Sequence, residues 1–76
     1  MTTKKNKFAI EYNLENPSIY YLTVSDVEEP QKTAIFCKYP EKSNSWYLHD
    51  FTDDFSEKDL EEAIYFLENE IGLKVD

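Results

Sequence analysis

The sequence predicts an α+β domain in which four antiparallel strands precede one C-terminal amphipathic helix packed on one face of the sheet (ββββα). Three observations predict this fold. Apolar residues alternate with period two through the first two-thirds of the chain, turn-forming clusters separate the alternating segments, and the last third changes to helical spacing. Short connections favour pairing between neighbouring strands, so we expect an antiparallel meander.

The first strand is expected over residues 7–14 and the second over residues 19–25. One face of the first strand carries apolar side chains: Phe8, Ile10, Tyr12 and Leu14. A turn around Pro17 follows, because Asn, Pro and Ser favour turns. The second strand is apolar on both faces, which indicates a central position in the sheet.

The third strand is expected over residues 33–39 and the fourth over residues 45–51. The loop before the third strand closes at Pro30, and the next loop begins at Pro40. Strict alternation in the fourth strand predicts that its side chains point to two opposite faces. One face carries Trp46, Leu48 and Asp50, and the other carries Tyr47, His49 and Phe51.

The start of the helix has a specific signature. Ser56 is a suitable N-cap residue, and Asp59 three positions later can complete a capping box. Phe55 before the cap and Leu60 in the first turns can form a hydrophobic staple. The pattern predicts a helix over residues 56–71.

One apolar stripe about 100° wide is expected to face the sheet, made of Leu60, Ala63, Ile64, Leu67 and Ile71. Gly72 occupies the position after the last turn, where glycine ends helices in the left-handed conformation. Leu73 can then pack back onto the helix.

Length and composition limit what this chain can be. Its 76 residues make a single domain over residues 1–76, and we expect residues 1–6 to be a flexible N-terminus. One cysteine, Cys37, and one histidine, His49, exclude an internal disulfide and a usual zinc site. The sequence has no apolar run long enough for a secretory signal or a membrane span. A lone cysteine suits a reducing compartment. We therefore expect a cytoplasmic location.

The net charge of −8 belongs to the last third of the chain. Residues 1–49 hold six acids and six lysines, whereas residues 50–76 hold ten acids and two lysines. This asymmetry argues against direct binding to nucleic acid or to an anionic membrane, and it favours a basic partner. All eight basic residues are lysine, so no arginine fork exists for phosphate.

The acidic segment predicts a partner-binding surface of carboxylates with two aromatic anchors. Its expected residues are Asp50, Asp53, Asp54, Glu57, Asp59, Glu61, Glu62, Tyr65, Phe66, Glu68 and Glu70. Glu57 and Glu61 repel at one-turn spacing, where a solvated helix normally mixes signs. We therefore expect an inhibitor or regulator that presents a nucleic-acid-like surface to a basic, nucleic-acid-binding protein. The charge layout is similar in kind to that of small phage-encoded inhibitors that mimic nucleic acid.

Two other interpretations fit the same sequence. The acidic helix face can be an ordinary solvated surface. Alternatively, the chain can be a homo-oligomeric structural or assembly subunit, at minimum a homodimer, whose aromatic sheet face is the interface. The aromatic residues of that face would be Tyr20, Tyr21, Phe36, Tyr39, Trp46 and Tyr47.

No enzyme, cofactor or metal function is expected. Residues 50–61 echo a calcium-binding loop, but Phe55 stands where the turn requires glycine and Lys58 occupies the ninth position. Cys37 and His49 form the only available pair of a nucleophile and a base, and no third side chain stands out that would orient the histidine.

Overall fold

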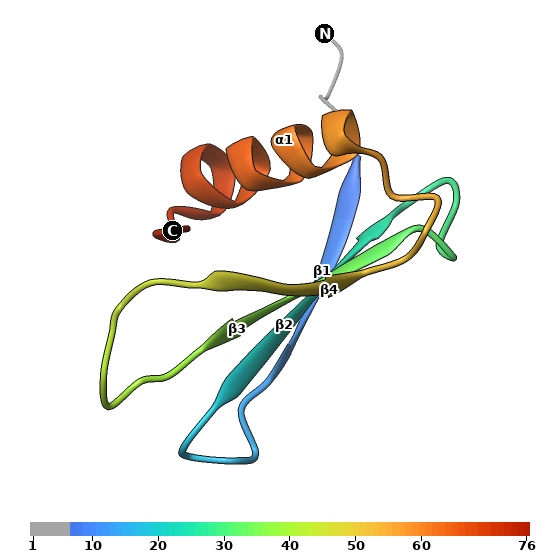
Figure 1. The fold of residues 1–76 in the computed structure, drawn as a ribbon. Helices are drawn as coiled ribbons and strands as arrows, with labels where there is room; N and C mark the ends of the chain where they lie inside the picture. Colours follow the sequence, from blue (N-terminus) through green and yellow to red (C-terminus); the bar gives the residue numbers. More distant parts are fainter. Residues whose placement is uncertain (1–6) are drawn as a thin grey trace, which may run out of the picture.

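The computed structural model describes residues 7–76, so the expectation for residues 1–6 lies outside the described residues (Figure 1). The elements are β1 (Phe8–Asn13), β2 (Tyr20–Asp26), β3 (Thr33–Lys38), β4 (Tyr47–Phe51), α1 (Glu57–Phe66) and η1 (Leu67–Ile71). Four antiparallel strands followed by one C-terminal helical segment confirm the predicted ββββα fold.

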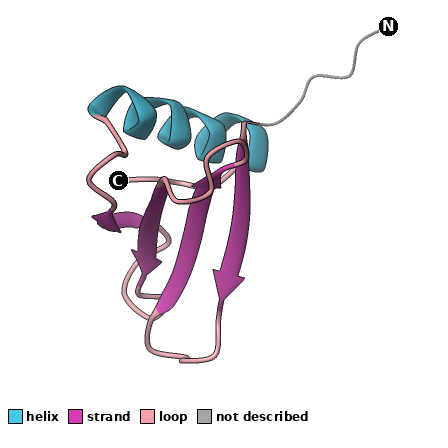
Figure 2. Cartoon of the chain, turned by 90° about the vertical axis from the view of Figure 1, so that its right-hand side faces the viewer, coloured by secondary structure: helices cyan, strands magenta, loops and turns pink. Residues whose placement is uncertain are grey.

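The sheet is an antiparallel meander with the order β1-β2-β3-β4. The predicted central position of the second strand is confirmed, because β2 pairs with both β1 and β3. Figures 1 and 2 show α1 lying across the end of the sheet where β1 begins, while the strands extend beyond it toward the two far loops.

The hydrophobic core lies between the helix and the sheet face that carries Phe8. Its buried members are Phe8, Leu22, Val24, Ala34, Phe36, Trp46, Phe55, Ala63, Phe66 and Leu67. The Phe8 ring lies 5.6 Å from the Phe66 ring and 6.4 Å from the Phe55 ring, measured between centroids. These aromatic contacts join the first strand to the turn before the helix and to the last residue of α1.

The helix is rotated relative to the predicted apolar stripe. Phe66, which the sequence placed on the outer surface, is only 8% exposed, whereas Ile71 of the predicted stripe is exposed. The predicted outer position of Phe66 is therefore wrong. The large Phe66 ring packs against Phe8, and burying a ring of that size stabilises the fold more than burying Ile71 completely would.

The end of the helix matches the prediction with one local difference. Gly72 is left-handed at φ 86°, as expected for the residue that ends the helix. The last turn, η1, is wider than an α-helical turn, and the Leu73 amide donates to the Leu67 carbonyl at 2.9 Å. A π-helical turn of this kind inserts one extra residue and displaces the side chains that follow. Ile71 lies in that turn.

The segment after Gly72 returns to the start of β4. Val75 forms a parallel bridge with Trp46, whose amide donates to the Lys74 carbonyl at 2.8 Å. The Asp76 amide donates to the Trp46 carbonyl at 2.9 Å. Trp46 is buried in this position, and the Tyr12 ring lies 6.1 Å from the Trp46 ring. The C-terminal tail thus completes the core that the short helix leaves uncovered.

An irregularity in the β3–β4 pairing corrects the predicted facing of the fourth strand. The register shifts between Ile35 and Phe36, so that Asp50 pairs with Ile35 and Phe51 pairs with Ala34. Directly paired residues share a sheet face, and Ala34 belongs to the core. Phe51 therefore lies on the helix side and Asp50 on the opposite side, the reverse of strict alternation.

Candidate partner-binding surface

The capping box at the start of α1 forms as the sequence predicts. The Asp59 amide donates to Ser56 Oγ at 3.1 Å, and the Ser56 amide donates to Asp59 Oδ2 at 2.9 Å. The Ser56 hydroxyl also donates to Asp59 Oδ2 at 2.9 Å. These bonds satisfy amides that have no partner within the helix, and they hold the Asp59 carboxylate against the underside of the helix.

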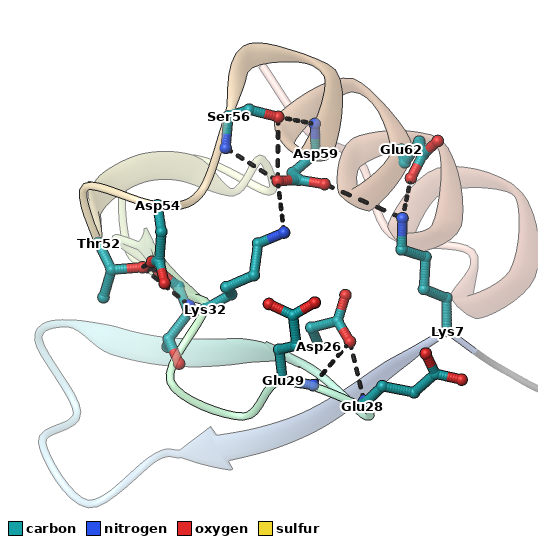
Figure 3. Close-up of polar contacts among 11 residues, drawn as sticks. Lys7, Asp26, Glu28, Glu29, Lys32, Thr52, Asp54, Ser56, Asp59 and Glu62 are labelled. Atoms are coloured by element: carbon teal, nitrogen blue, oxygen red, sulfur yellow. Dashed lines mark hydrogen bonds and ion pairs between the residues drawn. The ribbon is translucent and has the colours of Figure 1, made fainter.

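Two lysines, one directly before β1 and one directly before β3, lie beside the same carboxylate (Figure 3). Lys32 Nζ lies 3.3 Å from Asp59 Oδ2, and Lys7 Nζ lies 3.9 Å from Asp59 Oδ1. Lys7 also pairs with Glu62, one turn further along the helix. We call Lys7, Lys32, Asp59 and Glu62 the inner ion-pair cluster. It links the first helical turns to β1 and to the loop before β3.

The loop that carries Lys32 is itself fixed by Asp26 at the end of β2. Asp26 is buried, and its Oδ1 accepts from the amides of Glu28 at 2.8 Å and Glu29 at 3.0 Å (Figure 3). The Asp26 amide donates to the Lys32 carbonyl at 3.0 Å. A side chain that bonds to amides two and three residues ahead stabilises a turn, so the position of Lys32 follows from the loop.

The inner ion-pair cluster shifts the ionisation of its members. Hydrogen bonds from the Ser56 amide and hydroxyl, together with Lys32, lower the pKa of Asp59. The hydrogen bond to Asp59 raises the pKa of Lys32, and the bond to Glu62 raises the pKa of Lys7. Each shift favours the charged form, because each charged group has a partner that it would lose on unfolding.

On the outside of the helix, carboxylates and one aromatic side chain form a row. Glu57, Glu61 and Tyr65 are spaced by four residues, and Glu68 follows Tyr65 after three, so all four share one face. The three glutamates are exposed, and Tyr65 is 64% exposed. Among residues 7–76, no lysine lies within ion-pair distance of Glu57, Glu61 or Glu68.

The turn before the helix adds two exposed carboxylates, Asp53 and Asp54. Asp54 Oδ1 accepts from the Thr52 hydroxyl at 2.8 Å (Figure 3), and the Thr52 amide donates to the Thr33 carbonyl at 2.9 Å. Phe55 is buried in the core directly after them. The turn is therefore anchored on both sides. We call Asp53, Asp54, Glu57, Glu61 and Glu68, with Tyr65, the acidic helix face.

The structure divides the predicted surface residues into groups. Glu57, Glu61, Tyr65 and Glu68 share one side of the helix, and Asp53 and Asp54 are exposed in the turn before it. Asp59 and Glu62 instead belong to the inner ion-pair cluster, and Phe66 belongs to the core. Asp50 is exposed on the opposite sheet side, where its Oδ1 accepts from the Phe51 amide at 2.8 Å. Glu70 is exposed near the helix end and takes part in an interaction of its own.

Sequence reasoning missed the inner ion-pair cluster. The capping-box spacing identified Asp59 as a residue that serves the helix, which was a signal against its use in binding. Lys7 and Glu62 are separated by 55 positions in the chain, and no periodicity relates them. Their pairing depends on where the helix crosses the sheet, which local patterns do not specify.

The groups considered for catalysis or metal binding are arranged as packing groups. His49 packs edge-on against Tyr21, with 5.5 Å between ring centroids, and Cys37 is buried. Over residues 7–76, the hydrogen bonds include none between Cys37 and His49, and no three metal-binding side chains cluster. In the same range, no helix is both long and apolar enough to cross a membrane.

Comparison with protein-family models, with characterised proteins and with solved structures finds no match to this chain.

The lowered pKa of Asp59 predicts a specific pH dependence of stability. A carboxyl whose pKa is lower in the folded state stabilises the fold above its unfolded value of about 3.9, and this contribution is lost as the pH falls through the folded value. The free-energy difference between wild type and Asp59→Asn should therefore be largest near neutral pH and shrink in acid. Urea unfolding of both proteins from about pH 7 to about pH 2 measures this free-energy difference.

Glu61→Gln is the matched control, because it neutralises an exposed carboxylate with no lysine within ion-pair distance among residues 7–76. The free energy of unfolding of this variant should differ little from that of wild type, and the difference should stay nearly constant with pH. An Asp59→Asn difference that is equally flat would contradict the ion-pair account.

Proposed function

We propose that this chain is a small acidic binding module, inhibitory or regulatory, that presents the acidic helix face to a basic surface on a nucleic-acid-binding protein. The observation that carries the proposal is the row of Glu57, Glu61 and Glu68, exposed and without a lysine partner among residues 7–76. Crowded carboxylates repel one another, and a cationic partner relieves that repulsion on binding. The proposal places the module in the cytoplasm.

The acidic helix face carries fewer charges per unit length than one side of a nucleic acid duplex. The segment Glu57–Ile71 is 15 residues long and spans about 22 Å. Duplex DNA carries roughly 13 charges over that distance, and about half of them face a one-sided binder. Over that distance the acidic helix face offers three exposed carboxylates, Glu57, Glu61 and Glu68, and the preceding turn adds Asp53 and Asp54 beyond it. Lys58, also exposed, reduces the net value by one.

Tyr65 supplies the non-ionic part of the proposed contact. Its ring is the most exposed large hydrophobic side chain among residues 7–76 and lies within the row of glutamates. Aromatic anchors surrounded by polar groups provide much of the binding energy in protein interfaces. The charges would then set the association rate and its salt dependence, while Tyr65 would slow dissociation.

Charge reversal on the helix tests the proposal. The double variant Glu57→Lys and Glu61→Lys should lose a partner that wild type captures from extract of the native cells at low salt. Added salt and competing duplex DNA should each release that partner from wild type, because both weaken contacts to a cationic groove. Quantitative affinity capture across a salt series is the measurement.

Glu28→Lys with Glu41→Lys is the matched control, because both glutamates are exposed and lie off the helix. Each double variant changes the net charge from −8 to −4. The control should retain the partner. Equal loss from both variants would mean that only total charge matters, and retention unaffected by salt or DNA would contradict the proposal.

The uncovered sheet face favours a second candidate function, a homo-oligomeric assembly subunit. The predicted aromatic face is divided by the sheet: Phe36 and Trp46 are in the core and Tyr20 packs against it, whereas Tyr21 and Tyr47 share the opposite face. Among residues 7–76 no helix covers that opposite face, because α1 lies on the core side.

Sedimentation separates the two functions. A salt-insensitive dimer that dissociates on Tyr21→Ser would support the assembly subunit, because apolar interfaces respond little to ionic screening. A monomer at low and high salt would contradict the assembly subunit, whereas the acidic module is compatible with a monomer or a dimer.

A further inference from the structure

The outer edge of β1 has no strand beside it among residues 7–76 (Figure 2). Edge strands carry unpaired N–H and C=O groups that can pair with another chain, and folded proteins usually protect them. Bulges, prolines, inward-pointing lysines and covering segments are the common protections. An edge strand without these protections is therefore a candidate site for pairing with another chain.

The two edges of this sheet differ in protection. At β4, the pairing is irregular, and the C-terminal tail bonds to Trp46 on the outer side through Lys74 and Asp76. At β1, the register with β2 is regular from Phe8 to Asn13. The β1 sequence contains no proline, glycine or lysine. Within the described residues, only the β1 edge is regular and has no segment bonded along its outer side.

Strand geometry identifies which backbone groups of β1 point outward. The Lys7 carbonyl accepts from the Val27 amide at 2.9 Å, so Lys7 directs its backbone toward β2. Alternate residues of an antiparallel strand direct their backbone groups to opposite sides. Phe8, Ile10 and Tyr12 therefore direct three N–H and three C=O groups to the open edge.

The side chains along this edge are apolar on the core face, and they include a single carboxylate, Glu11. Ile10 packs partly against the core, while Tyr12 is 43% and Leu14 is 54% exposed on the same face. Glu11 lies on the other face and is exposed. The edge also borders a surface hollow whose lining holds two carboxylates and no cation: Glu11, Tyr12, Asn13, Leu14, Glu15 and Thr23.

We propose that the open edge of β1 binds an extended basic segment of the partner protein as a fifth strand. Lys or Arg side chains at alternate positions would lie beside Glu11, and the apolar residues between them would lie beside Ile10 and Tyr12. The backbone bonds provide affinity, and the alternating side chains provide specificity. The inference rests on the proposed function for the basic character of the partner.

Charge favours such a segment over a second copy of this chain as the occupant. Each copy carries −8, so pairing two copies through this edge brings like charges together. An antiparallel register centred on Glu11 would place two Glu11 carboxylates directly opposite, which is destabilising. A cationic segment is instead attracted to Glu11 and Glu15 beside the edge.

A synthetic nine-residue peptide of alternating Lys and Val, capped at both ends, tests the inference. It should bind the whole chain and slow amide hydrogen exchange at Phe8, Ile10 and Tyr12, because those N–H groups become bonded. Two peptides serve as controls. One replaces Lys by Glu, and the other has the same composition in two blocks. Both should bind at least about tenfold more weakly.

Tyr12→Pro tests the backbone role directly. The Tyr12 amide points outward, so proline removes an edge donor without removing a bond to β2. Affinity for the alternating peptide should fall by up to about tenfold, since one edge hydrogen bond is lost. Tyr12→Val keeps the amide and should stay within about threefold of wild type. The wild-type exchange measurement remains decisive if the proline variant does not fold.

Three results would overturn the inference: equal binding of the block peptide, unchanged exchange at the three amides under saturating peptide, or their concentration-dependent protection without peptide. The last would mean that a second copy occupies the edge. The Glu57→Lys and Glu61→Lys variant distinguishes this inference from the proposed function. If that variant loses the captured protein but still binds the peptide, the two surfaces act separately. If the peptide fails and capture persists, only the edge inference falls.

Discussion

The rotation of the helix about its own axis is the constraint on which the surface of this molecule depends. Asp59 is held by Ser56 and Lys32 on the side of the helix that faces the sheet, and Phe66 packs on Phe8. One polar and one apolar contact thus fix the same orientation two turns apart. With that side turned inward, the row of Glu57, Glu61 and Glu68 necessarily faces water.

This orientation separates the acidic residues of the last third into two chemical roles. The carboxylates near the sheet are matched by lysines and serve the fold, and their pKa shifts favour the charged forms. Glu57, Glu61 and Glu68 on the outside have no lysine partner among residues 7–76, and Glu70 takes part in an interaction of its own. Net negative charge destabilises a compact state through self-repulsion. An exposed row that keeps this repulsion is easier to explain by binding than by stability.

The sequence was sufficient to predict the fold, but it was insufficient to predict where about half of the proposed partner-binding residues lie. Period-two alternation, the Ser56 cap and Gly72 each depend on residues close in the chain, so the strands and both helix ends were predictable. The rotation of the helix depends on which ring fills the space beside Phe8, and a bulge reversed Asp50 and Phe51. Both result from packing between distant segments, which periodicity does not encode.

Comparing two neighbouring aromatic residues tests the helix orientation most directly. The account predicts that Phe66→Ala lowers the free energy of unfolding by about 3–5 kcal/mol, because a buried ring is replaced by a cavity. Tyr65→Ala should change it by less than about 1 kcal/mol, because that ring is mostly in water. Urea unfolding of the two variants measures both values. Equal losses, or a larger loss for Tyr65→Ala, would contradict the orientation and with it the acidic helix face.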